Sequence, residues 1–85
     1  MSRELKIRNI LMEVMEEYRN ASLKFKPFNS AHEGYAVIKE EVDELWEEVK
    51  KKKSDRKDTA MRAEALQIAA MGLRFVLDVC DKEAA

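Results

Sequence analysis

The sequence predicts an all-α protein built from three helices. Only two glycines and one proline occur in 85 residues, and hydrophobic residues make up 46% of the chain. Apolar residues recur at spacings of three and four along most of the sequence, which is the period of an amphipathic helix. We expect residues 1–85 to form a single domain, and a chain of this length buries only about 60% of its unfolded surface.

The first helix is expected over residues 3–22. The sequence KFKPFNS then breaks the helical period, because Pro27 has no amide hydrogen and biases Lys26 away from helical geometry. The apolar residues of this helix share one side and are Ile7, Ile10, Leu11, Val14 and Tyr18.

The second helix is expected to begin after Ser30. Ser30 and Glu33 have the spacing of a capping box, and the apolar phase continues without a slip to about Lys53. Its apolar residues are Ala31, Tyr35, Ile38, Val42, Leu45, Trp46 and Val49. We expect Tyr35 and Trp46 to pack in the core, with stacking on a nucleobase as the alternative.

The third helix follows the turn SDRKD, with Asp58 or Thr59 as its N-cap. It is apolar on two sides, one containing Leu66, Ala69, Leu73, Val76, Leu77 and Cys80, and the other Ile68, Met71, Phe75 and Val79. Such a helix needs more cover than two neighbours provide. The sequence therefore predicts an antiparallel hairpin of the second and third helices within an oligomeric helical bundle, with a dimer favoured over a tetramer.

Composition narrows the partners and the compartment. Sixteen basic and 17 acidic residues give a net charge of −1, so nothing calls for nucleic acid or an anionic membrane as a partner. One cysteine excludes an internal disulfide and fits a reducing compartment. The first residues lack the apolar core of a signal peptide, and no stretch approaches the roughly 18 apolar residues of a membrane span. We expect a cytoplasmic protein.

Acidic residues gather beside the apolar faces. Glu41, Glu44 and Glu48 fall on one stripe of the second helix, next to its apolar stripe. Heights along the expected hairpin allow Glu41, Glu44, Glu64 and Gln67 to converge on one spot. Carboxylates placed together repel one another unless a cation lies between them. The sequence therefore predicts a site for a hard divalent cation, Mg²⁺, which favours oxygen ligands and leaves positions for water and phosphate.

A family resemblance rests on the same residues. An ExxE pair, about twenty residues and then an ExxD-type pair looks like the MazG-like all-α nucleoside triphosphate pyrophosphohydrolases. The stretches HEGYAVIKEEVDELWEEVKKK and EALQIAAMGLRFVLDV are similar to short bacterial and phage members of that group. The resemblance covers roughly residues 29–80. It implies Mg²⁺-dependent hydrolysis of a nucleoside or deoxynucleoside triphosphate to the monophosphate and pyrophosphate, with Mn²⁺ as a possible substitute.

The resemblance also implies roles for individual residues. Glu41, Glu44 and Glu64 would be metal ligands, with Gln67 as the fourth, and Glu40 would activate water. Gln67 departs from the pattern, because the family's residue there is usually acidic. A neutral ligand predicts weaker ion binding, so turnover is reduced or lost, or one ion is bound in place of two.

Lys51 and Arg74 are the candidates for contacting substrate phosphate. For the basic turn that contains Lys51, the favoured interpretation is that cations stabilise the carboxyl end of a helix, and contact with phosphate is the alternative. For Arg74 the favoured interpretation is an ion pair with Asp78, one turn later, and contact with phosphate is the alternative. Two other functions stay open for the whole chain: nucleotide binding without turnover, and a helical oligomerisation or adaptor module whose acidic stripe is only surface.

Overall fold

The structure is a computed structural model that describes residues 1–82, and it confirms the predicted all-α class. Three α-helices follow one another, α1 (Arg3–Lys24), α2 (Ala31–Val49) and α3 (Asp58–Phe75). A π-helical turn, η1 (Val76–Cys80), continues directly from α3. Residues 1–82 contain no β-strand.

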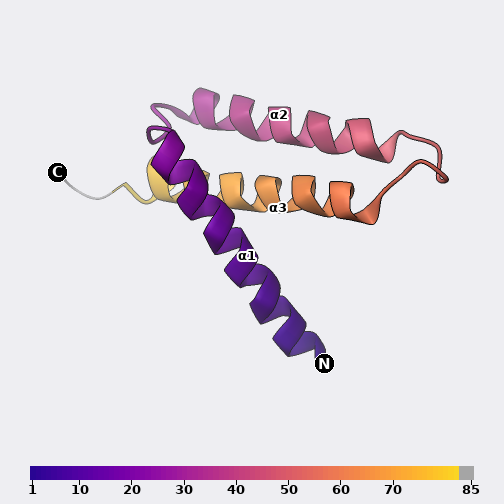
Figure 1. Ribbon diagram of the computed structural model, residues 1–85. Helices are drawn as coiled ribbons and strands as arrows, with labels where there is room; N and C mark the ends of the chain where they lie inside the picture. The colour runs from indigo at the N-terminus through magenta and orange to yellow at the C-terminus, as the bar shows by residue number, and fades with distance from the viewer. Residues whose placement is uncertain (83–85) are drawn as a thin grey trace.

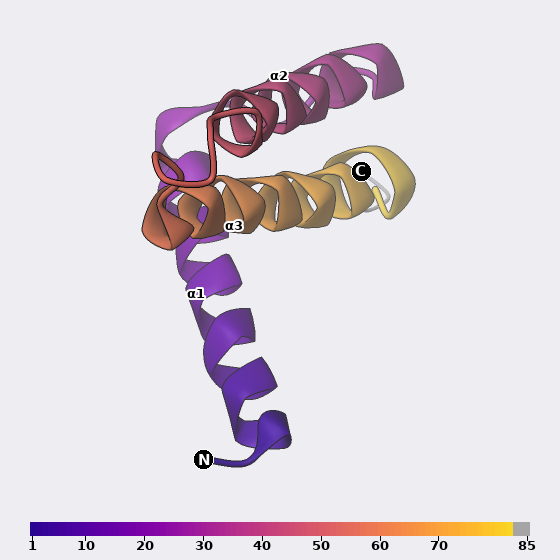
Figure 2. The same ribbon diagram turned by 90° about the vertical axis from the view of Figure 1, so that its right-hand side faces the viewer.

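Helices α2 and α3 lie side by side along their length, and residues 50–57 connect them at one end (Figure 1). Helix α1 meets this pair at the opposite end, beside the start of α2 and the end of α3. Its N-terminal half projects away from both helices, as the view turned by 90° also shows (Figure 2). The molecule is elongated, with extents of 50 × 31 × 19 Å.

Helix α1 begins at a side-chain cap, because the hydroxyl of Ser2 accepts the backbone N–H of Leu5 at 3.1 Å. Every residue from Met1 to Glu13 is exposed. Arg62 of α3 pairs with Glu13, and its guanidinium holds the pKa of Glu13 below the usual range. The N-terminal half of α1 therefore has polar rather than apolar attachment to the rest of the chain.

The core is small and lies where the C-terminal half of α1 meets α3. Its buried apolar residues are Ala21, Phe28, Ala70 and Met71. Gly34 allows α2 to approach this core closely. A Cβ atom on Gly34 would lie 2.6 Å from Cδ2 of Phe75 and 3.1 Å from Cδ2 of Phe28, so any larger residue would push the two rings away.

The predicted helix start at Ser30 is confirmed, since its hydroxyl accepts the backbone N–H of Glu33 at 3.1 Å. The carboxylate of Glu33 accepts Nδ2 of Asn29, so the reciprocal bond of a capping box is not among those of the described residues.

The end of α2 differs from the prediction. The helix stops at Val49 rather than near Lys53, because Nε of Arg56 donates to the carbonyl oxygens of Val49 and Lys51 and satisfies the helix end.

The third helix also differs at both ends. Asp58 is its first residue rather than its cap, and Lys57 precedes it with no capping side-chain bond among residues 1–82. The sequence TAMRAEALQIAAMGLRFVLDVCDK predicts one continuous α-helix. Instead it changes at Val76 to the wider π turn, closed by the N–H of Asp81 donating to the carbonyl of Val76 at 2.7 Å.

The expectation that Tyr35 and Trp46 pack in the core is wrong within one chain. Their exposed fractions are 64% and 58%. The apolar phase of α2 is therefore wider than the surface that the rest of the chain covers. No helix within residues 1–82 is long and apolar enough to cross a membrane.

Candidate metal centre and adjoining pocket

Three carboxylates converge between α2 and α3. Glu41 and Glu44 lie one turn apart on α2, and Glu64 approaches them from the first half of α3. One ligand atom from each residue lies within 4.8 Å of the others. The structure thus brings together the three carboxylates that the sequence assigned to a metal.

Burial and nearby negative charge raise the pKa of two of these carboxyl groups, Glu41 and Glu64. Burial, followed by the negative charges of Glu44 and Glu64, raises the pKa of Glu41 to about 7. The pKa of Glu64 is raised as well, first by burial and then by its hydrogen bond and charge interaction with Glu44. Negative charge on this cluster is therefore unfavourable, and a bound cation would reduce the repulsion between the carboxylates.

The donor set fits a hard divalent cation. Oε2 of Glu41 is buried and has no hydrogen-bond partner among the described residues. All three groups offer carboxylate oxygen, the ligand type that Mg²⁺ and Mn²⁺ take, and the cluster includes no histidine or cysteine within residues 1–82. An ion bound here would supply the partner that Oε2 of Glu41 lacks.

Gln67, the predicted fourth ligand, has a partner that the sequence analysis did not identify. Its Nε2 donates to Oε2 of Glu17 on α1 at 2.6 Å. The amide nitrogen is thereby directed toward α1, which leaves the carbonyl oxygen as the atom that an ion would use. Glu17 lies one turn before the buried Ala21, and this position on the packed side of α1 is the signal that could have identified it.

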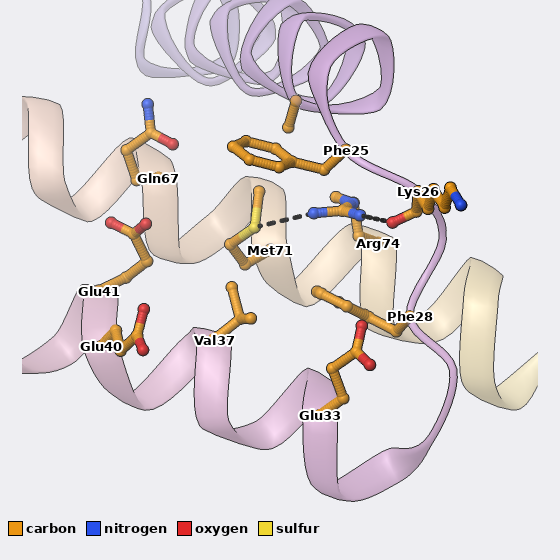
Figure 3. A pocket seen from close by; sticks show the side chains of 11 residues that line it. Phe25, Lys26, Phe28, Glu33, Val37, Glu40, Glu41, Gln67, Met71 and Arg74 are labelled. Carbon is orange, nitrogen blue, oxygen red and sulfur yellow. Dashed lines mark hydrogen bonds between the residues drawn. The ribbon is translucent and has the colours of Figure 1, made fainter.

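A pocket of about 370 Å³ adjoins the carboxylate cluster (Figure 3). Carboxylates of α2 line one wall, side chains of α3 line the second, and the end of α1 with the following connection closes the third. The lining residues are Ala21, Phe25, Lys26, Phe28, Glu33, Val37, Glu40, Glu41, Gln67, Met71 and Arg74. Glu41 and Gln67 belong to both the pocket wall and the predicted ligand set.

Arg74 is buried in the wall of this pocket, with 4% of its surface exposed. Its Nη2 donates to the carbonyl oxygen of Lys26 at 2.8 Å, and its guanidinium lies 4.3 Å from the centre of the Phe28 ring. Its Nε lies 4.0 Å from Oδ2 of Asp78, so the predicted ion pair is present. That carboxylate also accepts the backbone N–H of Phe28 at 3.0 Å.

Two other predicted residues lie in different places. Glu40 is exposed and lines the pocket beside Glu41. Lys51 is absent from the described pocket wall, and its Nζ pairs with Oε1 of Glu48 at 2.9 Å at the end of α2. Glu48 is close enough to Glu64 to help raise its pKa, so Lys51 acts at the edge of the cluster.

Phe25, Phe28 and Glu33 line the pocket but are not among the residues predicted for it. Glu33 was predicted only as part of a capping box, and its side chain instead accepts Nδ2 of Asn29 at 3.2 Å. The two phenylalanines flank Pro27 in a segment that the sequence identified only as a helix break. An aromatic pair on either side of a proline, next to a predicted helix start, is the signal that was available.

Comparison with protein-family models, with curated proteins and with solved structures finds no match to this chain.

Proposed function

We propose that the chain is a Mg²⁺-dependent hydrolase that converts a nucleoside or deoxynucleoside triphosphate to the monophosphate and pyrophosphate. The observation that carries this proposal is the convergence of Glu41, Glu44 and Glu64 at the edge of a pocket. The pocket also contains a buried arginine and two aromatic rings. A metal-binding edge beside a cationic and aromatic wall matches the phosphate and base parts of a nucleotide.

In this proposal Glu41, Glu44 and Glu64 hold the ion, and the carbonyl oxygen of Gln67 is the fourth ligand. When bound, Mg²⁺ neutralises charge on phosphate oxygens and lowers the pKa of a coordinated water. Glu40 lines the pocket next to the cluster, where its carboxylate can orient the attacking water and accept its proton. Mn²⁺ can replace Mg²⁺ because both favour oxygen ligands.

The other walls would bind the substrate. Arg74 contributes a positive charge that its bonds to Lys26 and Asp78 hold in a fixed position. Phe25 is 63% exposed and lines the pocket, so its ring would offer an apolar face to a base. Lys51, at the edge of the cluster, would meet a phosphate only by leaving Glu48.

Gln67 favours a second candidate, nucleotide binding without turnover. A neutral ligand attracts the ion less strongly than a carboxylate does, and its amide nitrogen is already bonded to Glu17. This candidate shares the metal and nucleotide with the first and differs only in the chemical step. A third candidate, an oligomerisation or adaptor module, is favoured by the many exposed apolar side chains.

The proposal includes the arrangement of the chain in its working form. Helices α2 and α3 would act as an antiparallel hairpin, and copies of the chain would assemble into a homo-oligomer, a dimer in preference to a tetramer. The working environment would be the cytoplasm, without nucleic acid or membrane as a partner.

The test is release of pyrophosphate from a panel of ribo- and deoxyribonucleoside triphosphates in the presence of Mg²⁺. We expect release by the parent, loss of release in Glu64→Gln, and retention in Glu47→Gln. Glu47 is a matched control, because it is an exposed carboxylate paired with Lys50 and outside the cluster. Metal-dependent binding without release would establish the second candidate. No nucleotide binding at all would leave only the third.

A further inference from the structure

The chain exposes far more surface than a compact protein of its mass. Its accessible surface is 6828 Å². A folded monomer of 9.9 kDa is expected to expose about 5,200 Å². The excess is therefore about 1,600 Å² per chain, whereas a standard interface covers about 800 Å² per partner and obligate homodimers cover more.

Two apolar stripes contribute to this excess. The α1 stripe consists of Ile7, Leu11 and Met15, which are 45%, 59% and 46% exposed and lie at i, i+4 and i+8 on one face of the helix. The α2 stripe consists of Tyr35, Val42 and Trp46, which are 64%, 45% and 58% exposed and also share one face.

The two stripes do not cover each other within one chain. The N-terminal half of α1 projects away from α2 in both views (Figures 1 and 2). The stripes are of similar length, rising about 12 Å along α1 and about 16 Å along α2. Each chain thus carries one projecting apolar helix and one uncovered apolar helix face.

We propose that a second copy of the chain covers these stripes, with the α1 stripe of each copy packed on the α2 stripe of the other. A two-fold dimer makes both contacts at once and leaves neither stripe open, so the assembly closes at two chains. The excess surface is enough for such an interface. The N-terminal half of α1, exposed from Met1 to Glu13, gains the apolar neighbour that its own chain does not provide.

This inference names the surface for the self-association proposed above, and it requires neither the metal nor the nucleotide. Its direct consequence concerns Trp46, the only tryptophan of the chain. Trp46 is 58% exposed in one chain and becomes covered by the partner's α1 stripe in the dimer. Its fluorescence therefore reports the interface without any added label.

The experiment combines sedimentation with Trp46 fluorescence on the unmodified chain, without metal or nucleotide. At micromolar concentration we expect a dimer whose Trp46 emission is blue-shifted and protected from acrylamide. Dilution should shift the emission to the red over the same concentrations at which the dimer dissociates. A monomer at these concentrations, or a dimer whose Trp46 is freely quenched, would overturn the proposal.

A matched pair of variants locates the surface. Leu11→Lys places a charge in the α1 stripe and should give a helical monomer with red-shifted Trp46 emission, although residue 11 is distant from Trp46 in sequence. Leu23→Lys is the control, because Leu23 is 87% exposed and lies about 120° around the helix axis from Leu11. It should remain a dimer with protected Trp46.

A Leu11→Lys protein that stays dimeric with Trp46 protected would place the interface elsewhere and overturn the proposal. If Leu11→Lys loses its helical circular dichroism, the dilution series of the parent still decides the outcome. Because every arm omits Mg²⁺ and nucleotide, failure here leaves the proposed hydrolase untouched, and failure of the hydrolase leaves this result unchanged.

Discussion

Arg74 and Glu41 are charged side chains on facing walls of the same pocket, and they differ in how their charges are compensated. Arg74 is buried with a carbonyl oxygen, a carboxylate and an aromatic ring around it, all supplied by the chain. Glu41 is half-buried, its Oε2 has no partner among residues 1–82, and its closest charged neighbours are other carboxylates. The described residues therefore provide partners for the charge of Arg74 but none for Oε2 of Glu41.

Arg74 therefore stabilises the fold in addition to lining the pocket, whereas the charge of Glu41 lacks a partner within the described part of the chain. A buried charge with a full set of partners fixes the surrounding structure, and removing it leaves the partners unsatisfied. A carboxylate among carboxylates raises the energy of the folded chain until a cation or a proton arrives. We therefore expect Arg74 to govern stability whether or not metal is present, and the Glu41 cluster to govern the response to metal.

The largest effect is expected from Arg74→Met. It leaves the carbonyl of Lys26 and the carboxylate of Asp78 without their cation, so the free energy of unfolding should fall by about 3–5 kcal/mol. Urea denaturation with and without Mg²⁺ should show the same loss. Arg62→Met, which removes an exposed partner of Glu13, is the control and should cost much less. Equal losses in the two variants would mean that Arg74 is not part of the scaffold.

Gln67→Glu should have the next largest effect. It replaces the donor to Glu17 with a carboxylate and adds charge to the cluster, so without metal the loss of stability should be about 1–3 kcal/mol. Saturating Mg²⁺ should shrink or reverse that loss, because the new carboxylate is a stronger ligand. Melting curves in both conditions measure the difference. An identical shift in both would place residue 67 away from the ion.

The pH dependence of stability follows from Glu41. Its folded pKa of about 7 lies above the unfolded value, so the metal-free folded state binds the extra proton. The resulting stability is fully present below about pH 4.5 and is lost as the pH rises to about 7. Comparing the melting temperatures of the parent and Glu41→Gln between pH 5 and pH 8 isolates this contribution. A parent whose difference from Glu41→Gln stays constant with pH would contradict the raised pKa.

The smallest effect is expected from Lys51→Ser. The pair of Lys51 with Glu48 lies at an exposed helix end, and such pairs contribute less than about 1 kcal/mol. Stability and Mg²⁺ response should both stay close to those of the parent in thermal melts. If Lys51 contacts phosphate, the variant should instead weaken the binding of a triphosphate, which titration with the nucleotide would reveal.

Features that depend on local sequence signals could be predicted from the sequence. The period of the apolar residues and the Ser30 cap were sufficient to predict three helices, because those signals are local. The spacing of Glu41, Glu44 and Glu64 was sufficient to bring them together once α2 and α3 lie side by side. Each of these inferences needs only the helical repeat and one turn between helices.

Contacts between distant segments could not be predicted from the helical repeat and the turns alone. The bond from Gln67 to Glu17 and the contacts of Arg74 with Lys26 and Phe28 depend on the angle at which α1 meets the other helices. No local pattern sets that angle. Trp46 was assigned to the core because its phase is apolar, but phase alone does not say whether its own chain or another one supplies the cover.

The most direct test of the metal centre is a titration of the metal-free protein with Mg²⁺, and separately with Mn²⁺, in a calorimeter. The parent should bind the ion, and at a hundred times the dissociation constant the folded state should gain about 2.7 kcal/mol. Glu44→Gln should abolish this binding, whereas Glu47→Gln should bind as the parent does. A parent that binds neither ion, or a Glu44→Gln protein that binds them as the parent does, would contradict the account.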